Sequence, residues 1–235
     1  MPKFCGEEER EALMKLCLIP AAGFGKRLGG PPAKEILIDP ENNRPIIDWS
    51  LELALKYALK PIVITRKSKT SLISYIEDNW LDRGVELMLV EASKEWPDSI
   101  LQSQNLWSEV NLMILPDTRF APQELVEKLI SDCEFKNQAS FGFFDTKESL
   151  ETWGILGISE GKSLQICEKP FDLVGADQFK AWGLIAFRKE VGKELFASLL
   201  KSNQDHQWFQ FSHSCSTHKL NYFKDITRKV SDLEF

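Results

Sequence analysis

Short apolar runs alternate with amphipathic segments through the first half of the chain. The apolar runs have the length of buried strands, and between them apolar residues recur at helical spacing. The predicted strands are 16–19, 62–65, 85–90 and 112–115, and the predicted helices begin near Pro45, Leu72, Asp98 and Pro122. Repeated strand and helix units of this length indicate a mostly parallel sheet, which binds ligands at the carboxyl ends of its strands.

The pattern changes after residue 138, where strand-like runs follow one another. The predicted elements are strands at 140–144, 153–158, 163–168 and 179–187, and one helix at 191–200 before a polar tail rich in aromatic residues. The chain contains neither an internal repeat nor a low-complexity linker. We therefore expect a single α/β domain over residues 1–235, with a first part at 16–138 and a smaller, strand-rich part at 139–235.

The composition narrows the class of protein. Hydrophobic residues make up 43% and charged residues 27% of 235 residues, as in ordinary soluble globular domains. A net charge of −6 argues against a general nucleic-acid surface, and the basic cluster at 66–69 is expected to be a solvated helix start. Five cysteines without a C-x-x-C pair indicate neither a disulfide framework nor a zinc site.

The sequence shows neither the pattern of a secretory signal nor that of a membrane-spanning segment. The first eleven residues are charged and lack an apolar signal region, and no apolar run has the length that spans a bilayer. We therefore expect a cytoplasmic protein that binds neither membranes nor nucleic acid. Trp208, Phe209 and Phe211 lie at nearly alternating positions and leave open whether they cover a sheet edge or form a homo-oligomer interface.

The segment 17–34 is the first candidate site, because a predicted buried strand leads into a glycine-rich turn. Glycines let backbone N–H groups approach an anion, and the cations Lys26, Arg27 and Lys34 can offset the charge of a triphosphate. The turn matches neither the G-x-G-x-x-G nor the G-x-x-x-x-G-K-[ST] pattern. An ordinary strand-to-helix turn with surface lysines is the alternative.

The turn Ala21-Ala22-Gly23-Phe24-Gly25-Lys26-Arg27-Leu28 resembles the signature of the sugar-phosphate nucleotidyltransferases. The resemblance implies the three-layer, Rossmann-like α/β fold of nucleotide-diphospho-sugar transferases, with a mostly parallel central sheet. Residues 16–138 would then form the nucleotide-binding part and 139–235 the acceptor-binding part. It implies catalytic roles for Arg27 on the β and γ phosphates and for Lys34 at the α-phosphorus. The implied nucleotide-binding residues are Ala21, Ala22, Gly23, Gly25 and Lys26.

The second half resembles the acceptor-binding segment of the same family. A glycine opens the strand at 153–158, and the strand at 163–168 ends in Glu168-Lys169-Pro170. The resemblance implies that Glu168 binds sugar hydroxyls, that Lys169 binds the acceptor phosphate and that Gly154 leaves room for the sugar ring. Gly183 is the implied acceptor residue of the following strand. The family usually has a polar residue before that glycine, and Trp182 stands there instead.

Asp117 and Asp225 are the candidate metal ligands. A carboxylate directly beyond a buried strand is well placed to hold Mg²⁺, which prefers few protein oxygens together with substrate phosphates. Asp117 is equally compatible with a simple turn after Pro116. The resemblance implies that Asp117 is one Mg²⁺ ligand and that Asp225, in a late strand, is the second.

Taken together, these resemblances imply a Mg²⁺-dependent nucleotidyltransferase with a nucleoside triphosphate and a phosphorylated sugar or alcohol as substrates. The leading interpretation joins a pyrimidine triphosphate to a sugar-1-phosphate, which gives a nucleotide sugar and pyrophosphate. The short interval between Arg27 and Lys34, and a segment around Ser99 that resembles a base-recognition segment, favour the alternative of a cytidylyltransferase for a non-sugar phosphorylated alcohol. Departures at Lys26, Pro116 and Trp182 leave a third interpretation, a catalytically silent binding or regulatory relative.

Overall fold

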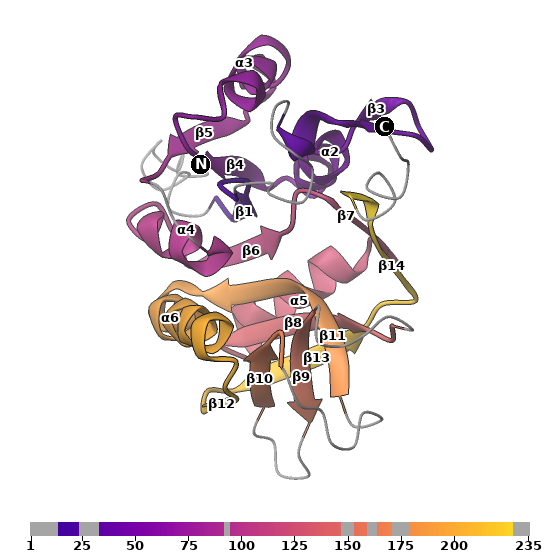
Figure 1. Ribbon diagram of the computed structural model, residues 1–235. Coiled ribbons are helices and arrows are strands. Elements are labelled where there is room, and N and C mark those ends of the chain that lie inside the picture. Colours follow the sequence, from indigo (N-terminus) through magenta and orange to yellow (C-terminus); the bar gives the residue numbers. More distant parts are fainter. Residues whose placement is uncertain are drawn as a thin grey trace, which may run out of the picture.

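The computed structural model describes residues 14–23, 33–91, 95–146, 153–158, 164–170 and 179–227 of the chain. Gly25, Lys26 and Arg27 of the predicted nucleotide site lie outside these ranges. The described residues form an α/β fold around one large sheet (Figure 1), and the sheet has a parallel part and an antiparallel part. None of its helices has the length and apolar character needed to span a bilayer.

The parallel part of the sheet has the strand order β6-β1-β4-β5. Its central strand β1 (Leu16–Pro20) pairs with β4 (Lys60–Thr65) on one side and with β6 (Val110–Ile114) on the other. The edge strand β5 (Glu86–Leu89) pairs with β4. These four strands confirm the four apolar runs predicted in the first half, with ends that differ by at most a few residues.

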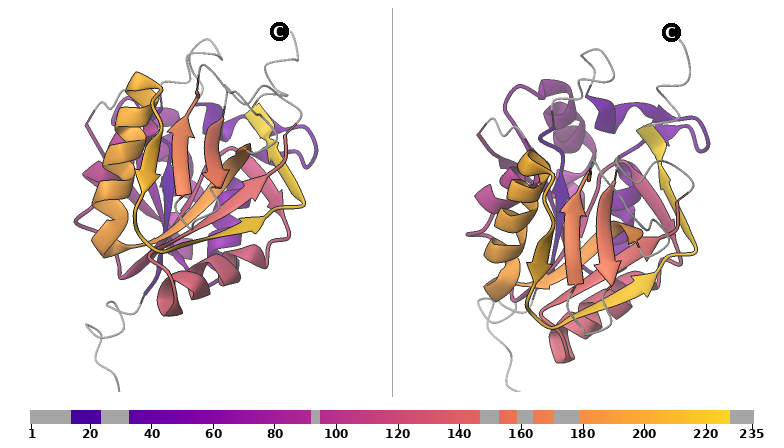
Figure 2. Two further views of the ribbon diagram at one scale, coloured as in Figure 1. Left: turned by 90° about the horizontal axis from the view of Figure 1, so that it is seen from below. Right: turned by 60° about the horizontal axis from the view of Figure 1, so that its bottom comes forward.

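The antiparallel part is organised around the long strand β11 (Phe179–Arg188), which pairs with β6 and so joins the two parts of the sheet. The other strands here are β8 (Ala139–Phe144), β9 (Gly154–Ile158), β10 (Leu164–Glu168), β12 (Phe209–Phe211) and β13 (Cys215–Lys219). β11 pairs with β8 and β9, β10 and β12 extend the sheet beyond β9, and β13 lies parallel to β8. Figure 1 shows these strands below the parallel part, and Figure 2, which turns that side toward the viewer, shows them in front of it.

Helices cover both faces of the sheet and make a three-layer structure. The helices on one face are α2 (Asp48–Lys56), α3 (Thr70–Asn79) and α5 (Leu125–Phe135), and those on the other are α4 (Trp96–Gln102) and α6 (Lys189–Asp205). Strand β1 serves both layers, since Cys17 and Ile19 join one apolar cluster while Leu16 and Leu18 join the other. This alternation is the period of two that a strand imposes. The expected three-layer α/β fold is confirmed.

Several helix starts differ from those predicted. The helix expected at Pro45 begins at Asp48, because residues 44–45 form strand β3 (Arg44–Pro45) and pair with β2 (Ile38–Asp39). The helix expected at Asp98 begins at Trp96, with Pro97 in its first turn, where its missing N–H is no loss. The helix expected at Pro122 begins at Leu125, after a turn.

Candidate active site

The glycine loop begins at the edge of the sheet where the parallel strands end. Ala21, the first residue after β1, donates its backbone N–H to the carbonyl of Ile64 at 2.8 Å, so the chain leaves the sheet beside the end of β4. The hydroxyl of Thr65 contacts the Ala21 carbonyl at 3.4 Å. Ala21 and Ala22 are buried and Gly23 is exposed, with no described atom within 4 Å of the place where a Cβ would lie. Gly23 therefore leaves its backbone open to an approaching group.

Lys34 and Asp117 come together at this same edge. Lys34 opens the short 3₁₀ helix η2 (Lys34–Ile36), and Asp117 lies three residues beyond the end of β6. The Lys34 ammonium donates a hydrogen bond to Oδ2 of Asp117, whose side chain is largely buried, with the whole residue 6% exposed. Two residues predicted from separate motifs thus form one ion pair.

A small two-stranded sheet brings Asp225 beside Asp117. Strand β7 (Thr118–Ala121) pairs in antiparallel register with β14 (Tyr222–Asp225), so that Asp225 lies opposite Thr118. The backbone N–H of Ile226 donates to the Asp117 carbonyl at 2.8 Å. β14 corresponds to the predicted late strand, whereas β7 is too short and polar to stand out in the sequence.

The hydroxyl of Thr227 links the two carboxylates and is a site residue that the motifs did not indicate. It lies 2.6 Å from Oδ1 of Asp225 and 3.4 Å from Oδ2 of Asp117. The backbone N–H of Thr227 also donates to Oδ1 of Asp225 at 3.0 Å. Thr227 therefore fixes the orientation of the Asp225 side chain and holds it next to Asp117.

The charged groups in this cluster shift one another's pKa values. Burial favours a raised pKa for Asp117, but the nearby Lys34 ammonium outweighs it and lowers that pKa. Burial and the negative charge of Asp117 raise the pKa of Asp225. Burial opposes the charge of Lys34, yet Asp117, Glu35 and Asp225 together raise its pKa. Asp117 and Lys34 are therefore held as a charged pair, while Asp225 experiences the repulsion of a second carboxylate.

The two carboxylates fit the requirements of a Mg²⁺ site. Within the described ranges, no group of three or more His, Cys, Asp and Glu side chains is arranged to hold a metal by itself. Mg²⁺ does not require such a cage, because it is commonly held by one or two carboxylates together with substrate phosphates and water. The repulsion between Asp117 and Asp225 is what a bound cation would relieve.

A buried ion pair between Lys69 and Glu35 adjoins this cluster. Lys69 Nζ contacts both carboxylate oxygens of Glu35, at 2.7 and 2.8 Å, and the two residues are 8% and 0% exposed. Lys69 immediately precedes α3, and Glu35 follows Lys34. The expectation that Lys69 belongs to a solvated helix start is therefore wrong, because its ammonium group is committed to a partner 34 residues away in the sequence.

The predicted acceptor residues Gly154, Glu168 and Lys169 come together where β9 begins and β10 ends. Glu168, the last residue of β10, pairs with Gly154, the first residue of β9. Lys169 follows with a positive φ of 48°, and its N–H donates to the Trp153 carbonyl at 3.0 Å. Burial raises the pKa of Glu168 to about 7, although Lys169 and a hydrogen bond from Trp96 act in the opposite direction.

The space beside Gly154 is occupied by side chains of the protein itself. A Cβ added to Gly154 would lie 2.2 Å from Nε1 of Trp182 and 2.3 Å from Oε1 of Glu168. A Cβ on Gly183 would lie 2.0 Å from an atom of the Phe223 ring. Both glycines are therefore required by close packing, and the room that the resemblance assigns to a sugar ring at Gly154 holds an indole ring and a carboxylate.

Ser99 lies inside α4 and is almost fully buried. Its hydroxyl donates to the Trp96 carbonyl at 2.6 Å, which satisfies that donor within the helix. α4 packs against α6 and β1. A part of Ser99 in base recognition stays a prediction.

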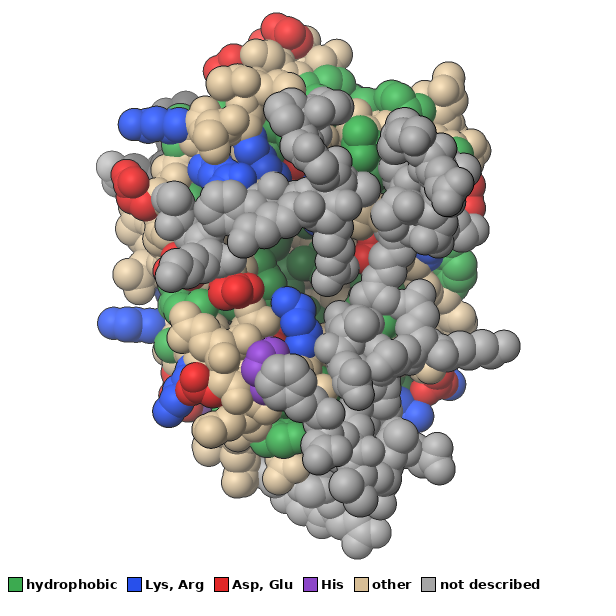
Figure 3. Space-filling view, viewed as in Figure 1, with side chains coloured by type: hydrophobic (Ala, Val, Ile, Leu, Met, Phe, Trp, Pro, Cys, Tyr) green, Lys and Arg blue, Asp and Glu red, His purple; other side chains and the backbone are tan. Residues whose placement is uncertain are grey.

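Figure 3, drawn from the same side as Figure 1, shows a hollow near the centre of this face, with hydrophobic side chains and Lys or Arg side chains at its border.

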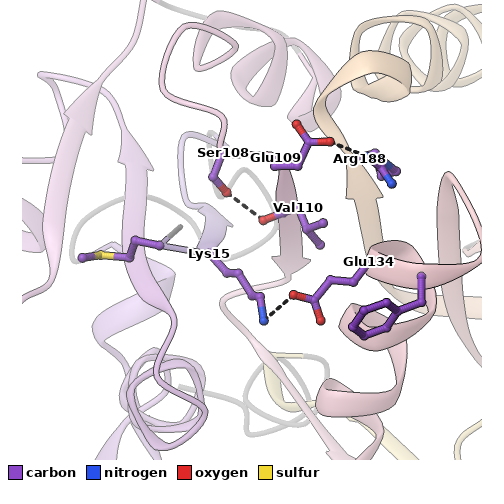
Figure 4. A pocket seen from close by; sticks show the side chains of 8 residues that line it. Lys15, Ser108, Glu109, Val110, Glu134 and Arg188 are labelled. Atoms are coloured by element: carbon purple, nitrogen blue, oxygen red, sulfur yellow. Dashed lines mark hydrogen bonds and ion pairs between the residues drawn. The ribbon is translucent and has the colours of Figure 1, made fainter. Parts of the chain in front are cut away.

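A separate cavity of about 270 Å³ lies at the opposite, amino-terminal ends of β1 and β6 (Figure 4). Its charged groups are paired, Lys15 with Glu134 at 2.6 Å and Arg188 with Glu109. This cavity contains none of the predicted site residues.

No protein-family model and no curated protein sequence matches the chain. Solved structures do. A provisionally assigned glucose-1-phosphate thymidylyltransferase from Bacillus anthracis, in complex with sucrose, has a TM-score of 0.70 and 15% identity, covering 94% of this chain and 97% of that one. A UTP-bound UGPase from Acinetobacter baumannii has a TM-score of 0.65 and 19% identity, covering 94% and 91%.

A third similar structure is HddC from Yersinia pseudotuberculosis, complexed with GMP-PN. Its TM-score is 0.64 at 16% identity, covering 91% of this chain and 93% of that one. All three likenesses extend over nearly the whole length of both chains, so they concern the complete arrangement of layers rather than a shared half. The resemblance read from the glycine loop is thus confirmed at the level of the fold, and the chain has the fold of the sugar-phosphate nucleotidyltransferases.

Proposed function

We propose that this protein is a Mg²⁺-dependent nucleotidyltransferase, which transfers a nucleotidyl group from a nucleoside triphosphate to a phosphate monoester. The observation that carries the proposal is the cluster of Lys34, Asp117 and Asp225 at the carboxyl edge of the parallel strands. This edge is where open α/β sheets bind their ligands. The similar structures support it, since one is UTP-bound and another is complexed with GMP-PN.

The chemistry follows from the charges of the cluster. A phosphate monoester has a second pKa of about 6 and is already a nucleophile at neutral pH. Its oxygen attacks the α-phosphorus, a new P–O bond forms, the bond to the bridging oxygen breaks, and pyrophosphate leaves with that electron pair. No general base is needed, so the protein contributes positioning and charge neutralisation.

Individual residues have distinct roles in this proposal. Lys34 offsets the negative charge that gathers on the oxygens of the α-phosphorus, and Asp117 holds its ammonium group at the site. Asp117 and Asp225 hold Mg²⁺, which neutralises phosphate charge when it is bound. Thr227 orients the Asp225 carboxylate. Arg27, on the β and γ phosphates, and the loop residues Gly25 and Lys26 complete the triphosphate site.

The substrates are proposed from the sequence motifs and the similar structures together. A pyrimidine triphosphate and a sugar-1-phosphate are the leading pair, in line with the names of the thymidylyltransferase and UGPase structures. Glu168 and Lys169 are the acceptor residues of this proposal. Transfer of CMP to a non-sugar phosphorylated alcohol is the second candidate, and the occupied space beside Gly154 favours it.

A silent binding subunit is the remaining alternative. Against it, the fold brings one ammonium and two carboxylate groups together in a largely buried place, at a cost in desolvation. A protein that had lost catalysis would gain stability by replacing them with apolar side chains. The intact cluster therefore supports an active enzyme.

Pyrophosphate release tests the proposal. The purified protein is incubated with Mg²⁺, each of CTP, UTP, dTTP, ATP and GTP, and a series of phosphorylated sugars and alcohols. We expect release with one nucleotide and one class of acceptor, and its loss in Lys34→Met. Lys56→Met is the matched control, because Lys56 is exposed and its ammonium group contacts Gln123 at 2.8 Å and the ring of Tyr57, neither of which belongs to the proposed site. Absence of release from folded wild-type protein with every pair would overturn the proposal.

A further inference from the structure

The lysine proposed to act on the α-phosphorus lies on a very short element. Lys34 is the first residue of η2, a 3₁₀ helix of three residues whose start has no side-chain cap. Backbone hydrogen bonds from Ile36 to Ala33 at 3.1 Å and from Leu37 to Lys34 at 3.2 Å close its turn. A single helical turn is only marginally stable by itself. The orientation of η2 must therefore come from the elements packed around it.

Two helices hold η2 from outside. The carboxylate of Glu35, the middle residue of η2, accepts hydrogen bonds from Nζ of Lys69, directly before α3, at 2.7 and 2.8 Å. The Glu35 carbonyl accepts from the backbone N–H of Ile47, directly before α2, at 2.9 Å. The backbone N–H of Ala33 donates to the hydroxyl of Ser71 in α3 at 3.3 Å. Glu35 is thus the residue through which η2 is attached to the starts of both helices.

Glu35 and Lys34 point to different partners, although they are neighbours in the chain. Successive side chains of a 3₁₀ helix lie about 120° apart around its axis, because the helix has three residues per turn. Glu35 reaches Lys69, whereas Lys34 reaches Oδ2 of Asp117. The rotation of η2 that places the Glu35 carboxylate on Lys69 therefore also sets the direction in which Lys34 leaves the helix.

Stability alone is a weak reason for this ion pair. Glu35 and Lys69 are 0% and 8% exposed, so both charges are taken out of water. Replacing a buried ion pair by apolar side chains of similar volume is often neutral or stabilising, because the cost of desolvation offsets the attraction. Apolar contacts have no direction, whereas hydrogen bonds between charged groups fix a geometry. What the pair offers beyond apolar side chains is a fixed orientation of η2.

We propose that Glu35 and Lys69 are positioning residues of nucleotidyl transfer: their ion pair holds η2 in the orientation from which the Lys34 ammonium group reaches the α-phosphorus. The proposal rests on the proposed function and adds two residues that act through Lys34 without contacting the substrates. A displacement of about 1 Å in a catalytic arrangement can cost on the order of 100-fold in rate. Loss of the pair should therefore slow the chemical step more than it weakens nucleotide binding.

The test measures pyrophosphate release by the double variant Glu35→Leu/Lys69→Met, which removes both charges together. With the substrate pair that the wild type uses fastest, we expect kcat to fall about 10- to 100-fold, while KM for the nucleoside triphosphate changes less than about three-fold. The control variant Lys15→Met/Glu134→Leu removes another ion pair, 2.6 Å long, at the opposite end of β1 (Figure 4). It should keep the kcat of the wild type.

A second measurement reports on the position of Lys34 without catalysis. The coupling energy between Lys34→Met and Asp117→Asn is measured by urea unfolding, without Mg²⁺ or nucleotide, once in the wild-type background and once in the double variant. If the ion pair of Glu35 and Lys69 holds Lys34 toward Asp117, this coupling energy is smaller in the double variant. A pair that only contributes to overall stability leaves the coupling energy unchanged.

The outcomes separate the two proposals. A wild-type kcat in the double variant, a loss confined to KM, an equal loss of kcat in the control variant, or an unchanged coupling energy overturns the inference and leaves the nucleotidyltransferase function standing. If the wild type turns over no pair of substrates, the function fails, and the unfolding measurement alone decides the inference. Glu35→Gln/Lys69→Met replaces the double variant if the latter does not fold.

Discussion

Lys34 donates a hydrogen bond from its ammonium group to a carboxylate oxygen of Asp117, across 83 positions of sequence. The residue proposed to act on the α-phosphorus and a residue proposed to hold Mg²⁺ are therefore joined before any substrate binds. Each lowers the cost of burying the other's charge. The pair links the nucleotide loop of the parallel part to the end of β6.

Replacing either metal carboxylate should abolish most of the Mg²⁺-dependent turnover. We expect Asp117→Asn and Asp225→Asn to lower kcat/KM for pyrophosphate release on the order of 100-fold, because the neutral amide neither binds Mg²⁺ well nor offsets its charge. The Mg²⁺ concentration that gives the half-maximal rate should be higher in both variants than in the wild type. The check is a Mg²⁺ titration at saturating nucleotide.

Asp145→Asn is the matched control for these variants. Asp145 is an exposed carboxylate that pairs with Lys180 at 2.9 Å and with Lys219 at 2.5 Å, so the change removes a charge of the same kind away from the cluster. Its Mg²⁺ titration should match the wild type. If the titrations of Asp117→Asn and Asp225→Asn also match the wild type, the metal is held elsewhere.

Glu168 should make the protein less stable as the pH rises. Its pKa moves from 4.5 to about 7 in the folded protein, because burial disfavours the charged form. Between these two values the unfolded chain releases its proton first, so the free energy of unfolding falls from pH 4.5 to pH 7 and stays low above it. The full difference is at most about 3 kcal/mol.

Glu168→Gln removes this titration, since an amide stays neutral at every pH. The variant should unfold at higher urea concentration than the wild type at pH 8, and the difference should vanish near pH 4.5. Glu127→Gln, at an exposed position of α5, should follow the wild type at both pH values. If the difference in unfolding free energy between Glu168→Gln and the wild type is the same at pH 4.5 and at pH 8, Glu168 is ionised in the folded protein as easily as in the unfolded chain.

The parallel part of the fold could be predicted from the sequence because its central strands are buried on both faces. Strands β1, β4 and β6 are covered on both faces, so each is predominantly apolar and stands out against its neighbours. Lys34 was predicted as a cation of the glycine-rich segment that follows β1, and Asp117 was predicted because it follows β6 closely. The local sequence pattern therefore predicted the fold class, and it also indicated where the candidate site lies.

Three of the missed features depend on partners that lie far apart in the sequence. Strand β7 has only four residues and is defined by its pairing with β14, about a hundred residues later. The burial of Lys69 depends on Glu35, and the closed space beside Gly154 depends on Trp182. No local period or motif encodes such contacts. Tertiary packing decided them, and the acceptor site is therefore the part least accessible from the sequence.

The Glu35 and Lys69 pair should behave as a single unit. Lys69→Met or Glu35→Leu alone leaves a buried charge without its partner, and we expect each to lower the free energy of unfolding by about 3–5 kcal/mol. The double variant buries two apolar groups in their place and should lie within about 1–2 kcal/mol of the wild type. Urea unfolding of the four proteins gives the coupling energy. Additive losses in the double variant would show that the two groups do not depend on each other.

Asp132 ties α5 to the edge strand β13, and the loss of its charge should loosen that contact. One oxygen of its carboxylate, Oδ2, accepts a hydrogen bond from the Ser216 hydroxyl at 2.7 Å and lies 2.6 Å from Nε2 of His218. Burial alone would raise the pKa of Asp132, but these two contacts outweigh it and lower that pKa. The ionised form is thus favoured in the folded protein, and its contribution to stability is present above the ordinary pKa of 3.8 and disappears as the pH falls through the lower folded value.

Asp132→Asn keeps the shape and an acceptor oxygen but removes the charge. We expect it to lower the free energy of unfolding by about 1 kcal/mol at pH 7, which is the difference between a hydrogen bond to a charged group and one to a neutral group. The deficit should shrink as the pH is lowered below 3.8, because the wild-type carboxylate then becomes neutral as well. Asp145→Asn again serves as the exposed control. A deficit that stays constant down to the acid limit would mean that packing, and not the charge of Asp132, holds β13 against α5.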